Sequence, residues 1–158
     1  MSLKDKLPFE IIHIGLANSH RDAQKIAQEY DAELPTMEQL GQLATYLYNY
    51  DETIGAQQNI SGGISLDTAK ASQLLSASPY SNRFYVWSGQ ESDGNCASVR
   101  VFNSDATYAG DDYRYHYGGL AVCVRKTRAE NVRDEIESDV KKWMEELNKR
   151  YEHNTITT

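Results

Sequence analysis

Residues 111–119 carry the side chains that are best suited to recognising another molecule. The segment reads Asp-Asp-Tyr-Arg-Tyr-His-Tyr-Gly-Gly, with tyrosines at the alternate positions 113, 115 and 117. In an extended chain, alternate side chains point to the same side, so the three rings would share one face. Rigid aromatic rings give a large contact area at low entropic cost, and the Asp, Ser, Asn and Gly residues around them supply adaptable hydrogen bonds. The segment is typical of a contact surface; the alternative is that the three rings cover a small core.

The residues that could do covalent or metal chemistry form no recognisable motif. Cys96 and Cys123 are too few for a disulfide-stapled scaffold or a CxxC zinc site, and the four histidines stand in no Cys-His pattern. Asp105, Asp111 and Asp112 could hold a hard cation, but an acidic loop is usually only solvated. We therefore expect no catalytic residue, no metal and no cofactor. The two cysteines lie on or beside strands that we expect to be neighbours, so a disulfide and two reduced thiols both remain open.

The composition sets further limits on the class of protein. A chain of 158 residues, 40% of them hydrophobic, suits one domain with or without a short appendage. The net charge of -7 argues against nucleic acid as the main partner, and no run of apolar residues is long enough to span a membrane. The apolar stretch after Leu7 is short and interrupted and is not a signal peptide, so we expect a cytoplasmic or virion protein unless a leader has been removed. The 11 tyrosines, against 3 Phe and 2 Trp, favour a contact surface.

The elements that must position these residues follow from hydrophobic periodicity and helix-capping signals. Strands are expected at 10–16, 84–88, 97–102 and 120–125, and Trp87 is expected in the core. Ser19 begins a helix over 20–30, and Thr36 with Gln39 forms a capping box for a second helix. Residues 51–63 read as a loop, and 67–76 hold a helical turn or two. The order predicts an α+β domain.

The C-terminal part of the sequence predicts a separate amphipathic helix over 127–151. Thr127 and Glu130 form a capping box, and large apolar residues recur at helical spacing from Val132 to Leu147. The helix could pack back on the domain, or it could mediate homo-oligomerisation or docking to a larger assembly. Residues 152–158 are expected to be a disordered tail.

Four short motifs resemble a bacterial C-type lectin-like group. They are Leu34-Pro35-Thr36 with Gln39-Leu40, Trp87-Ser88-Gly89 with Glu91, Val99 to Asn103, and Val122 to Arg125. The group includes the Fibrobacter succinogenes major paralogous domain, the formylglycine-generating (sulfatase-modifying-factor) fold and the variable proteins of diversity-generating retroelements. The chain departs from the group at Gly89, where a second serine is expected. The resemblance covers about residues 10–126.

The resemblance to retroelement variable proteins implies a solvent-facing binding surface between the second motif and the last strand. In those proteins this surface is diversified and rich in Asn, Tyr, Asp, Ser, Gly and His. The matching positions here are Asn95, Ser98, Arg100, Asn103, Ser104, Thr107, Tyr108, Asp111, Asp112, Tyr113, Tyr115, His116 and Tyr117.

The other activities of the group match this sequence less well. Formylglycine-generating enzymes use two cysteines close together near the C-terminal end, whereas Cys96 and Cys123 are far apart. The Glu-Pro-Asn and Trp-Asn-Asp motifs of calcium-dependent lectins are missing. We therefore expect a C-type lectin-like domain over 1–126 with two N-terminal helices, a small antiparallel sheet and an appended helix. It would be a non-enzymatic, diversified, tyrosine-rich binder of a protein or glycan. The alternatives are an assembly module of a phage tail or pilus tip and, less favoured, an enzyme on the formylglycine-generating scaffold.

Overall fold

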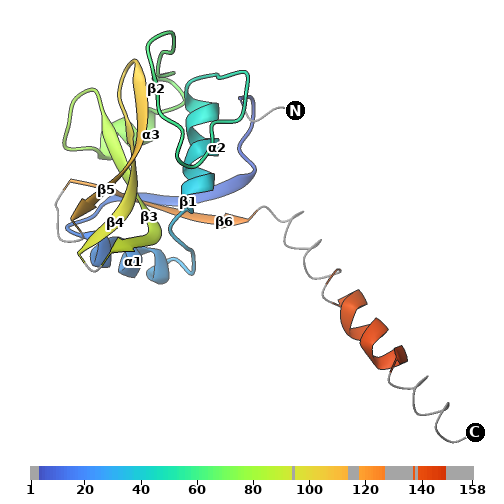
Figure 1. Cartoon of the computed structure of the whole chain (residues 1–158). Helices are drawn as coiled ribbons and strands as arrows, with labels where there is room; N and C mark the ends of the chain where they lie inside the picture. The colour runs from blue at the N-terminus through green and yellow to red at the C-terminus, as the bar shows by residue number, and fades with distance from the viewer. Residues whose placement is uncertain (1–3, 94, 114–117, 127–136, 138, 149–158) are drawn as a thin grey trace, which may run out of the picture. The chain divides into compact units, whose positions relative to one another are not determined.

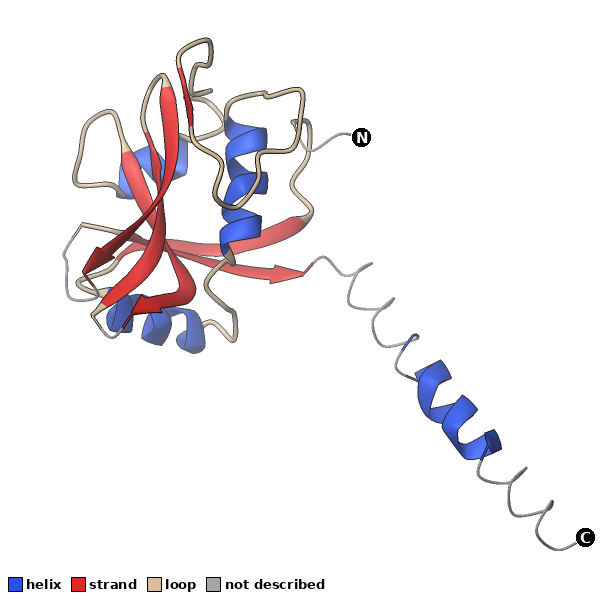
Figure 2. Ribbon diagram, viewed as in Figure 1, coloured by secondary structure: helices blue, strands red, loops and turns tan. Residues whose placement is uncertain are grey.

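A computed structural model describes residues 4–93, 95–113, 118–126, 137 and 139–148, and shows a mixed α+β fold (Figures 1 and 2). The chain divides into two compact units, Met1–Arg125 and Lys126–Thr158. The elements of the first unit are, in order, β1 (Phe9–Leu16), α1 (His20–Glu29), α2 (Met37–Leu47), β2 (Ile60–Ser61), α3 (Ser72–Ala77), β3 (Phe84–Asp93), β4 (Cys96–Phe102), β5 (Ala106–Tyr113) and β6 (Leu120–Lys126).

The strands form one six-stranded sheet in the order β1-β6-β3-β4-β5-β2. Strands β3, β4 and β5 are antiparallel neighbours, and β2 pairs antiparallel with β5. Strand β6 runs parallel to β3, with Val86 opposite Leu120. The sheet is therefore mixed, which corrects the expectation of a purely antiparallel one. Strand β6, the last of the described strands along the chain, lies between β1 and β3.

Helices cover both faces of the sheet (Figure 2). On one face, Leu40 of α2 and Leu74 of α3 pack in the same core as Phe84 and Phe102 of the strands. On the other face, Ala23 and Ala27 of α1 pack with Tyr85, Trp87 and Val99. Trp87 has no exposed surface, so the expectation that it is a core residue is confirmed. Because both faces are covered, alternation along a strand does not by itself tell which side chains meet water.

The two N-terminal helices begin where their capping residues predict. The Ser19 hydroxyl accepts a hydrogen bond from the Asp22 amide at 3.1 Å, and the Thr36 hydroxyl accepts one from the Gln39 amide at 3.0 Å. The Gln39 side chain in turn accepts the Thr36 amide at 2.9 Å, which completes the capping box. Each of these bonds satisfies a backbone donor that the helix itself leaves unpaired. Both predicted helices are confirmed.

Two of the sequence motifs meet in space and brace the fold. The Gly89 amide donates to the Pro35 carbonyl at 2.9 Å, and the Gln90 side-chain oxygen accepts the Met37 amide at the start of α2 at 2.9 Å. Ser88, completely buried, donates to the Ser98 carbonyl of β4 at 2.7 Å. The motif at residues 87–90 therefore ties β3 to β4 and to the beginning of α2.

The last motif holds the end of α1. The Arg125 guanidinium donates to the carbonyls of Tyr30 and Asp31, at 2.8 and 2.9 Å. These carbonyls lie just beyond α1, where backbone acceptors lack helical partners and a positive charge is favoured. Arg125, near the end of β6, thus holds a segment that lies more than ninety positions earlier in the chain.

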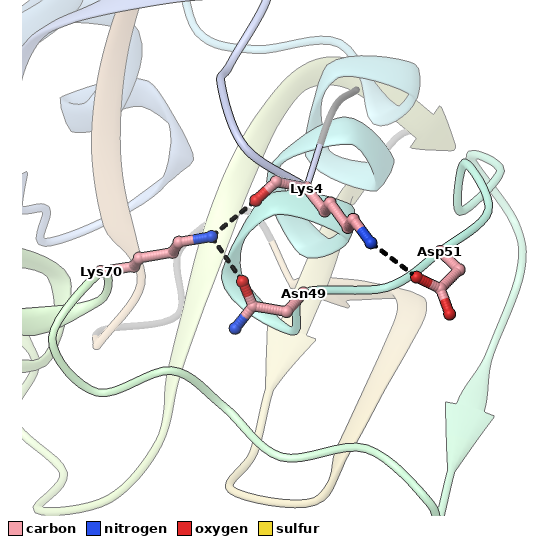
Figure 3. Close-up of polar contacts among 4 residues, drawn as sticks. All are labelled: Lys4, Asn49, Asp51 and Lys70. Atoms are coloured by element: carbon pink, nitrogen blue, oxygen red, sulfur yellow. Dashed lines mark hydrogen bonds and ion pairs between the residues drawn. The ribbon is translucent and has the colours of Figure 1, made fainter. Parts of the chain in front are cut away.

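A lysine joins the N-terminal segment to the end of α2 (Figure 3). The Lys70 ammonium donates to the carbonyls of Lys4 and Tyr46 and to the side-chain oxygen of Asn49, at 2.6, 3.1 and 2.6 Å. It also lies 4.3 Å from the centre of the Tyr46 ring. The Lys4 ammonium in turn forms an exposed ion pair with Asp51 at 2.9 Å, which raises the pKa of Lys4 and lowers that of Asp51. Lys70 therefore uses all three of its donors on partners from two separate segments.

Two strands were not expected from the sequence. No strand was predicted where β5 lies, because Ala-Thr-Tyr-Ala-Gly-Asp-Asp-Tyr has little aliphatic content and Gly and Asp disfavour strands. It forms because all of its residues from Thr107 to Tyr113 pair with β4. The two-residue β2 lies inside the expected 51–63 loop and pairs with the beginning of β5.

Residues 139–148 of the second unit are helical, within the helix expected over 127–151. The side chains of Val140, Trp143, Met144 and Leu147 are exposed there. Positions 127–136, 138 and 149–151 of the expected helix lie outside the described residues, as does the expected tail over 152–158. In the described part of the chain, no helix has the length and apolar character needed to cross a membrane.

Candidate functional site

The neighbouring strands β3, β4 and β5 carry or border most of the residues implied as a binding surface. Their register sets Tyr85 of β3 opposite Val101 of β4, and Val101 opposite Tyr108 of β5. Residues directly opposite each other in a sheet point to the same face. Tyr85, Val101 and Tyr108 therefore form a row across the three strands on the face that α1 also covers.

A cavity of about 230 Å³ lies at this row and is lined by Tyr80, Arg83, Phe84, Tyr85, Val101, Asn103 and Tyr108. We call it the tyrosine cavity. Tyr108 is 38% exposed at its rim, whereas Tyr85 is almost completely buried. The Tyr80 and Tyr85 rings lie 6.5 Å apart between centres, and the Arg83 guanidinium carbon lies 4.7 Å from the centre of the Tyr80 ring. The cavity thus combines aromatic walls with one cation and one amide.

The electrostatic surroundings of Tyr85 differ from those of Arg83. Burial, reinforced by the negative charge of Asp112, raises the pKa of Tyr85 well above its ordinary value. Its hydroxyl therefore stays protonated and can act as a hydrogen-bond donor. The Asp112 charge is felt at Tyr85, while the positive charge of Arg83 lies over Tyr80. Arg83 is therefore the charged side chain on the lining of the cavity, whereas Asp112 is not on that lining.

Two glycines let the chain pass close to these rings. Gly118 has a φ of +112°, a region that side chains rarely adopt, and a Cβ at this position would lie 3.0 Å from the Tyr80 hydroxyl. A Cβ at Gly119 would overlap the Trp87 indole nitrogen and lie 2.7 Å from the Tyr85 ring. The backbone that leads into β6 is therefore held against the back of the tyrosine cavity.

The prediction that Arg100 and Thr107 are surface contacts is wrong, because both side chains are completely buried. They face the opposite side of the sheet from the tyrosine cavity, under the segment that precedes β2. The Arg100 guanidinium donates to the Thr107 hydroxyl at 2.9 Å and to the Gln58 carbonyl at 2.5 Å. The Thr107 hydroxyl donates to the Val101 carbonyl at 2.8 Å. These side chains hold the loop to the sheet.

Arg100 is an unusual interior group. Burial lowers its pKa to about 10, and one of its terminal nitrogens is buried without a partner among the described residues. Nearby, burial raises the pKa of Tyr48, whose hydroxyl lies 2.6 Å from the Asn103 carbonyl and 2.9 Å from the Ala106 carbonyl. Such groups carry a desolvation cost that hydrogen bonds offset only in part.

The remaining implied residues that the structure describes lie at several places along the same strands. Asn103 lines the tyrosine cavity, and Ser104 is exposed in the turn between β4 and β5. Ser98 and Asp111 bond to each other at 3.2 Å on the face opposite the cavity. Asn95 is exposed in the β3–β4 turn.

The tyrosine segment over 111–119 is described only at its two ends, 111–113 and 118–119. Tyr113 ends β5, but its side chain is not among the described parts, and Tyr115, His116 and Tyr117 lie outside the described residues. The prediction that the three rings share one face therefore stays a prediction.

Sequence reasoning missed Tyr80, Arg83 and Tyr85. They precede or begin β3, in Pro-Tyr-Ser-Asn-Arg-Phe-Tyr, and we read Tyr85 only as part of a buried strand. Strand pairing brings them to Tyr108, more than twenty positions later. The available signal was the alternation of Tyr85 with Phe84 and Val86, which puts Tyr85 on the other side of β3.

The cysteines do not form a disulfide. Neither Cys96 nor Cys123 is bonded to the other, and Cys123 is completely buried. Cys96 is in β4 and Cys123 in β6, and β3 lies between these strands. Two inter-strand spacings amount to about 10 Å, which exceeds the reach of a disulfide. The expectation that their strands are neighbours is wrong.

A second cavity of about 470 Å³ lies between α1 and the motif residues Leu34 to Thr36. Its polar lining is largely amide, from Gln24, Gln28 and Gln90, with Glu33 as an ionisable side chain. It contains none of the implied surface residues. In the described part of the chain, no group of three or more His, Cys, Asp or Glu side chains could hold a metal ion.

Comparison with known proteins gave no match to any family, to any curated protein or to any solved structure. The site must therefore be interpreted from its own geometry.

Proposed function

We propose that this chain is a ligand-binding protein with a C-type lectin-like fold, and that it contacts a partner protein through the surface around the tyrosine cavity. The observation that supports this most directly is the row of Tyr85, Val101 and Tyr108, with Tyr80 and Arg83 beside it. Tyrosine and arginine are the residues that dominate protein interfaces, because they combine apolar area with directed hydrogen bonds. A diversified variable protein of a retroelement is the identity that we favour.

The row also suits recognition physically. Tyr85 is fixed by burial and by its edge-on contact with Trp87, whose ring centre is 6.0 Å away. Tyr85 therefore gives the exposed Tyr108 and its surroundings a rigid support, and rigid surfaces lose little entropy when a partner binds. Asn103, Ser104 and Asp112 border the row or extend it along the strands and supply polar groups. This arrangement resembles an antibody-like contact more than a catalytic centre.

A selection experiment tests the proposal with a defined probe. The full chain would be panned against a phage-displayed random peptide library, and the dissociation constants of enriched peptides would be measured for the parent and for Tyr108→Ala. We expect at least a tenfold loss on substitution, since central aromatic contacts contribute about 2 kcal/mol or more. A glycan array would be probed in parallel. If the chain bound glycans and no peptides, the proposed partner would be a carbohydrate and not a protein.

Tyr30 provides the matched control. It is 42% exposed, close to the 38% of Tyr108, but it lies at the end of α1 and stacks on His13 at 4.1 Å. Tyr30→Ala should leave peptide affinity unchanged. The tyrosine cavity would be refuted as the contact surface if both variants lost peptide affinity equally, or if Tyr108→Ala bound the enriched peptides as tightly as the parent.

A second candidate function is assembly through the C-terminal helix. It is favoured by one observation: four large apolar side chains, Val140, Trp143, Met144 and Leu147, are exposed on residues 139–148. Light scattering after size exclusion would compare the full chain with Trp143→Glu and, as control on a charged position, Glu145→Lys. A parent oligomer that only Trp143→Glu dissociates would support assembly, and a monomeric parent would remove it.

A further inference from the structure

The tyrosine cavity contains a cation whose side chain is positioned but not neutralised. The Arg83 guanidinium lies over the Tyr80 ring, and in the described part of the chain no carboxylate pairs with it. A guanidinium is attracted to the face of an aromatic ring and still has N–H donors for other acceptors. Those donors remain available to a planar acceptor.

Hydrogen bonds order the backbone turn that carries Tyr80 and Arg83. The Ser78 hydroxyl donates to the Arg83 carbonyl at 2.7 Å and accepts the Tyr80 amide at 3.1 Å. This one hydroxyl therefore bonds to the backbone of both Tyr80 and Arg83 in the same turn. Preorganisation of this kind lowers the entropic cost of binding.

The size and polarity of the cavity limit what it can hold. Its volume of about 230 Å³ lies below the range of sites for drug-sized ligands, which begins at about 300 Å³. It suits a single side chain presented by a larger partner. Besides Arg83, the lining offers the Asn103 amide and the hydroxyls of Tyr80 and Tyr108, which can donate hydrogen bonds.

Charge decides between the candidate side chains. A cationic side chain would be repelled by the positive charge of Arg83. An apolar side chain would cover the guanidinium N–H donors and leave them without hydrogen-bond partners. A carboxylate accepts two parallel hydrogen bonds from the guanidinium fork, and its short apolar stem fits between the rings. Arg83 is the one charged side chain on the lining, so an incoming anion would bind beside it.

We propose that the tyrosine cavity captures the carboxylate of an aspartate or glutamate side chain from a partner protein, with Arg83 as the charged contact and Tyr80 and Tyr108 as its walls. This inference rests on the proposed function, because it specifies what the same surface recognises. Its consequence is that partners are selected for an exposed acidic residue, although the chain as a whole is acidic.

The test uses two probes that differ only in charge. Amide resonances of the isotope-labelled full chain would be followed while N-acetyl-glutamate amide or N-acetyl-glutamine amide is added at concentrations of tens of millimolar. We expect saturable shifts at Val101 and Tyr108 with the glutamate probe and at least fivefold weaker binding of the glutamine probe, since charge-assisted hydrogen bonds are about twice as strong as neutral ones.

Two variants complete the test. Arg83→Gln should weaken the glutamate probe at least fivefold, whereas Arg21→Gln, which removes an exposed arginine of α1, should change nothing. Equal binding of both probes, no shift with either, or an unchanged response in Arg83→Gln would each overturn the carboxylate proposal. None of these results would change the outcome of the peptide selection, which tests the proposed function independently of the carboxylate proposal. Melting temperatures of the variants would confirm that they fold.

Discussion

Gly41→Ala is the substitution whose effect the structure predicts against the usual helix rule. Gly41 lies within α2, and in an unconstrained helix a change from glycine to alanine stabilises by about 1 kcal/mol. Here the added Cβ would overlap the Ile54 carbonyl and would lie 3.1 Å from the Gly55 carbonyl oxygen. Both are backbone atoms, so the loop has to move as a unit.

The cost of that movement follows from what the loop loses. The Ile54 amide donates to the Thr45 hydroxyl at 2.8 Å in a buried bond, whose loss costs about 1 kcal/mol. The Ile54 side chain is almost completely buried, and partial exposure or overpacking there costs about 1–3 kcal/mol. Set against the gain in helix propensity, the net expectation is a destabilisation of about 2 kcal/mol.

Urea unfolding followed by circular dichroism would measure this change. Gly110→Ala is the matched control, because a Cβ there meets nothing within 4 Å, and it should alter the free energy of unfolding by less than about 0.5 kcal/mol. If Gly41→Ala instead raised stability by about 1 kcal/mol, the close packing of the loop on α2 would be refuted.

Three further predictions concern other buried or bonded groups. Lys70→Met removes three hydrogen bonds from a half-buried ammonium and should lower the free energy of unfolding in urea by about 1–2 kcal/mol, whereas Lys25→Met on exposed α1 surface should not. Burial raises the pKa values of Tyr48 and Tyr85, so the free energy of unfolding should be constant below about pH 10 and should fall above it, by at most about 1.4 kcal/mol per pH unit for each group, because the unfolded tyrosines ionise there and the buried ones do not. Arg100, whose pKa is lowered to about 10, has the opposite effect above that pH and offsets the loss of stability from one of the two tyrosines. Thermal melts in which stability rises above pH 10 would contradict a net loss. Burial raises the pKa of the Cys123 thiol, so in the native chain a thiol reagent should modify Cys96 first, as mass spectrometry would show; equal rates would contradict the burial of Cys123.

The sequence predicted the elements that carry a local signal. Both N-terminal helices have capping residues, and β1, β4 and β6 are rich in aliphatic or β-branched residues. Strand β5 has no such signal, since its conformation comes from pairing with β4, a partner that no local pattern reveals. The tyrosine cavity was missed for the same reason, because its walls meet only once β3, β4 and β5 are in register.

Arg100 shows why polarity alone was a poor guide to the candidate site. Along β4 the polar residues Ser98 and Arg100 alternate with Ala97, Val99 and Val101, a pattern that normally puts the polar side chains in water. The segment before β2 covers that face, and its Gln58 carbonyl takes a hydrogen bond from the arginine. The pattern assigned the two faces of β4 correctly, but not which of them meets solvent.

The position of β6 between β1 and β3 has a consequence for how the chain is made. Strand β1 is synthesised before the other described strands, yet its neighbour β6 begins only at Leu120, so β1 has to wait while more than a hundred residues are synthesised. At about 5–20 residues per second that wait lasts several seconds or more. During that interval the isoleucine-rich β1 lacks the one neighbour that it has in the described sheet, and its unpaired edges are templates for aggregation. Chains that stall before Leu120 should therefore be targets for chaperones, and a cut that removes β6 should expose β1 rather than merely shorten the sheet.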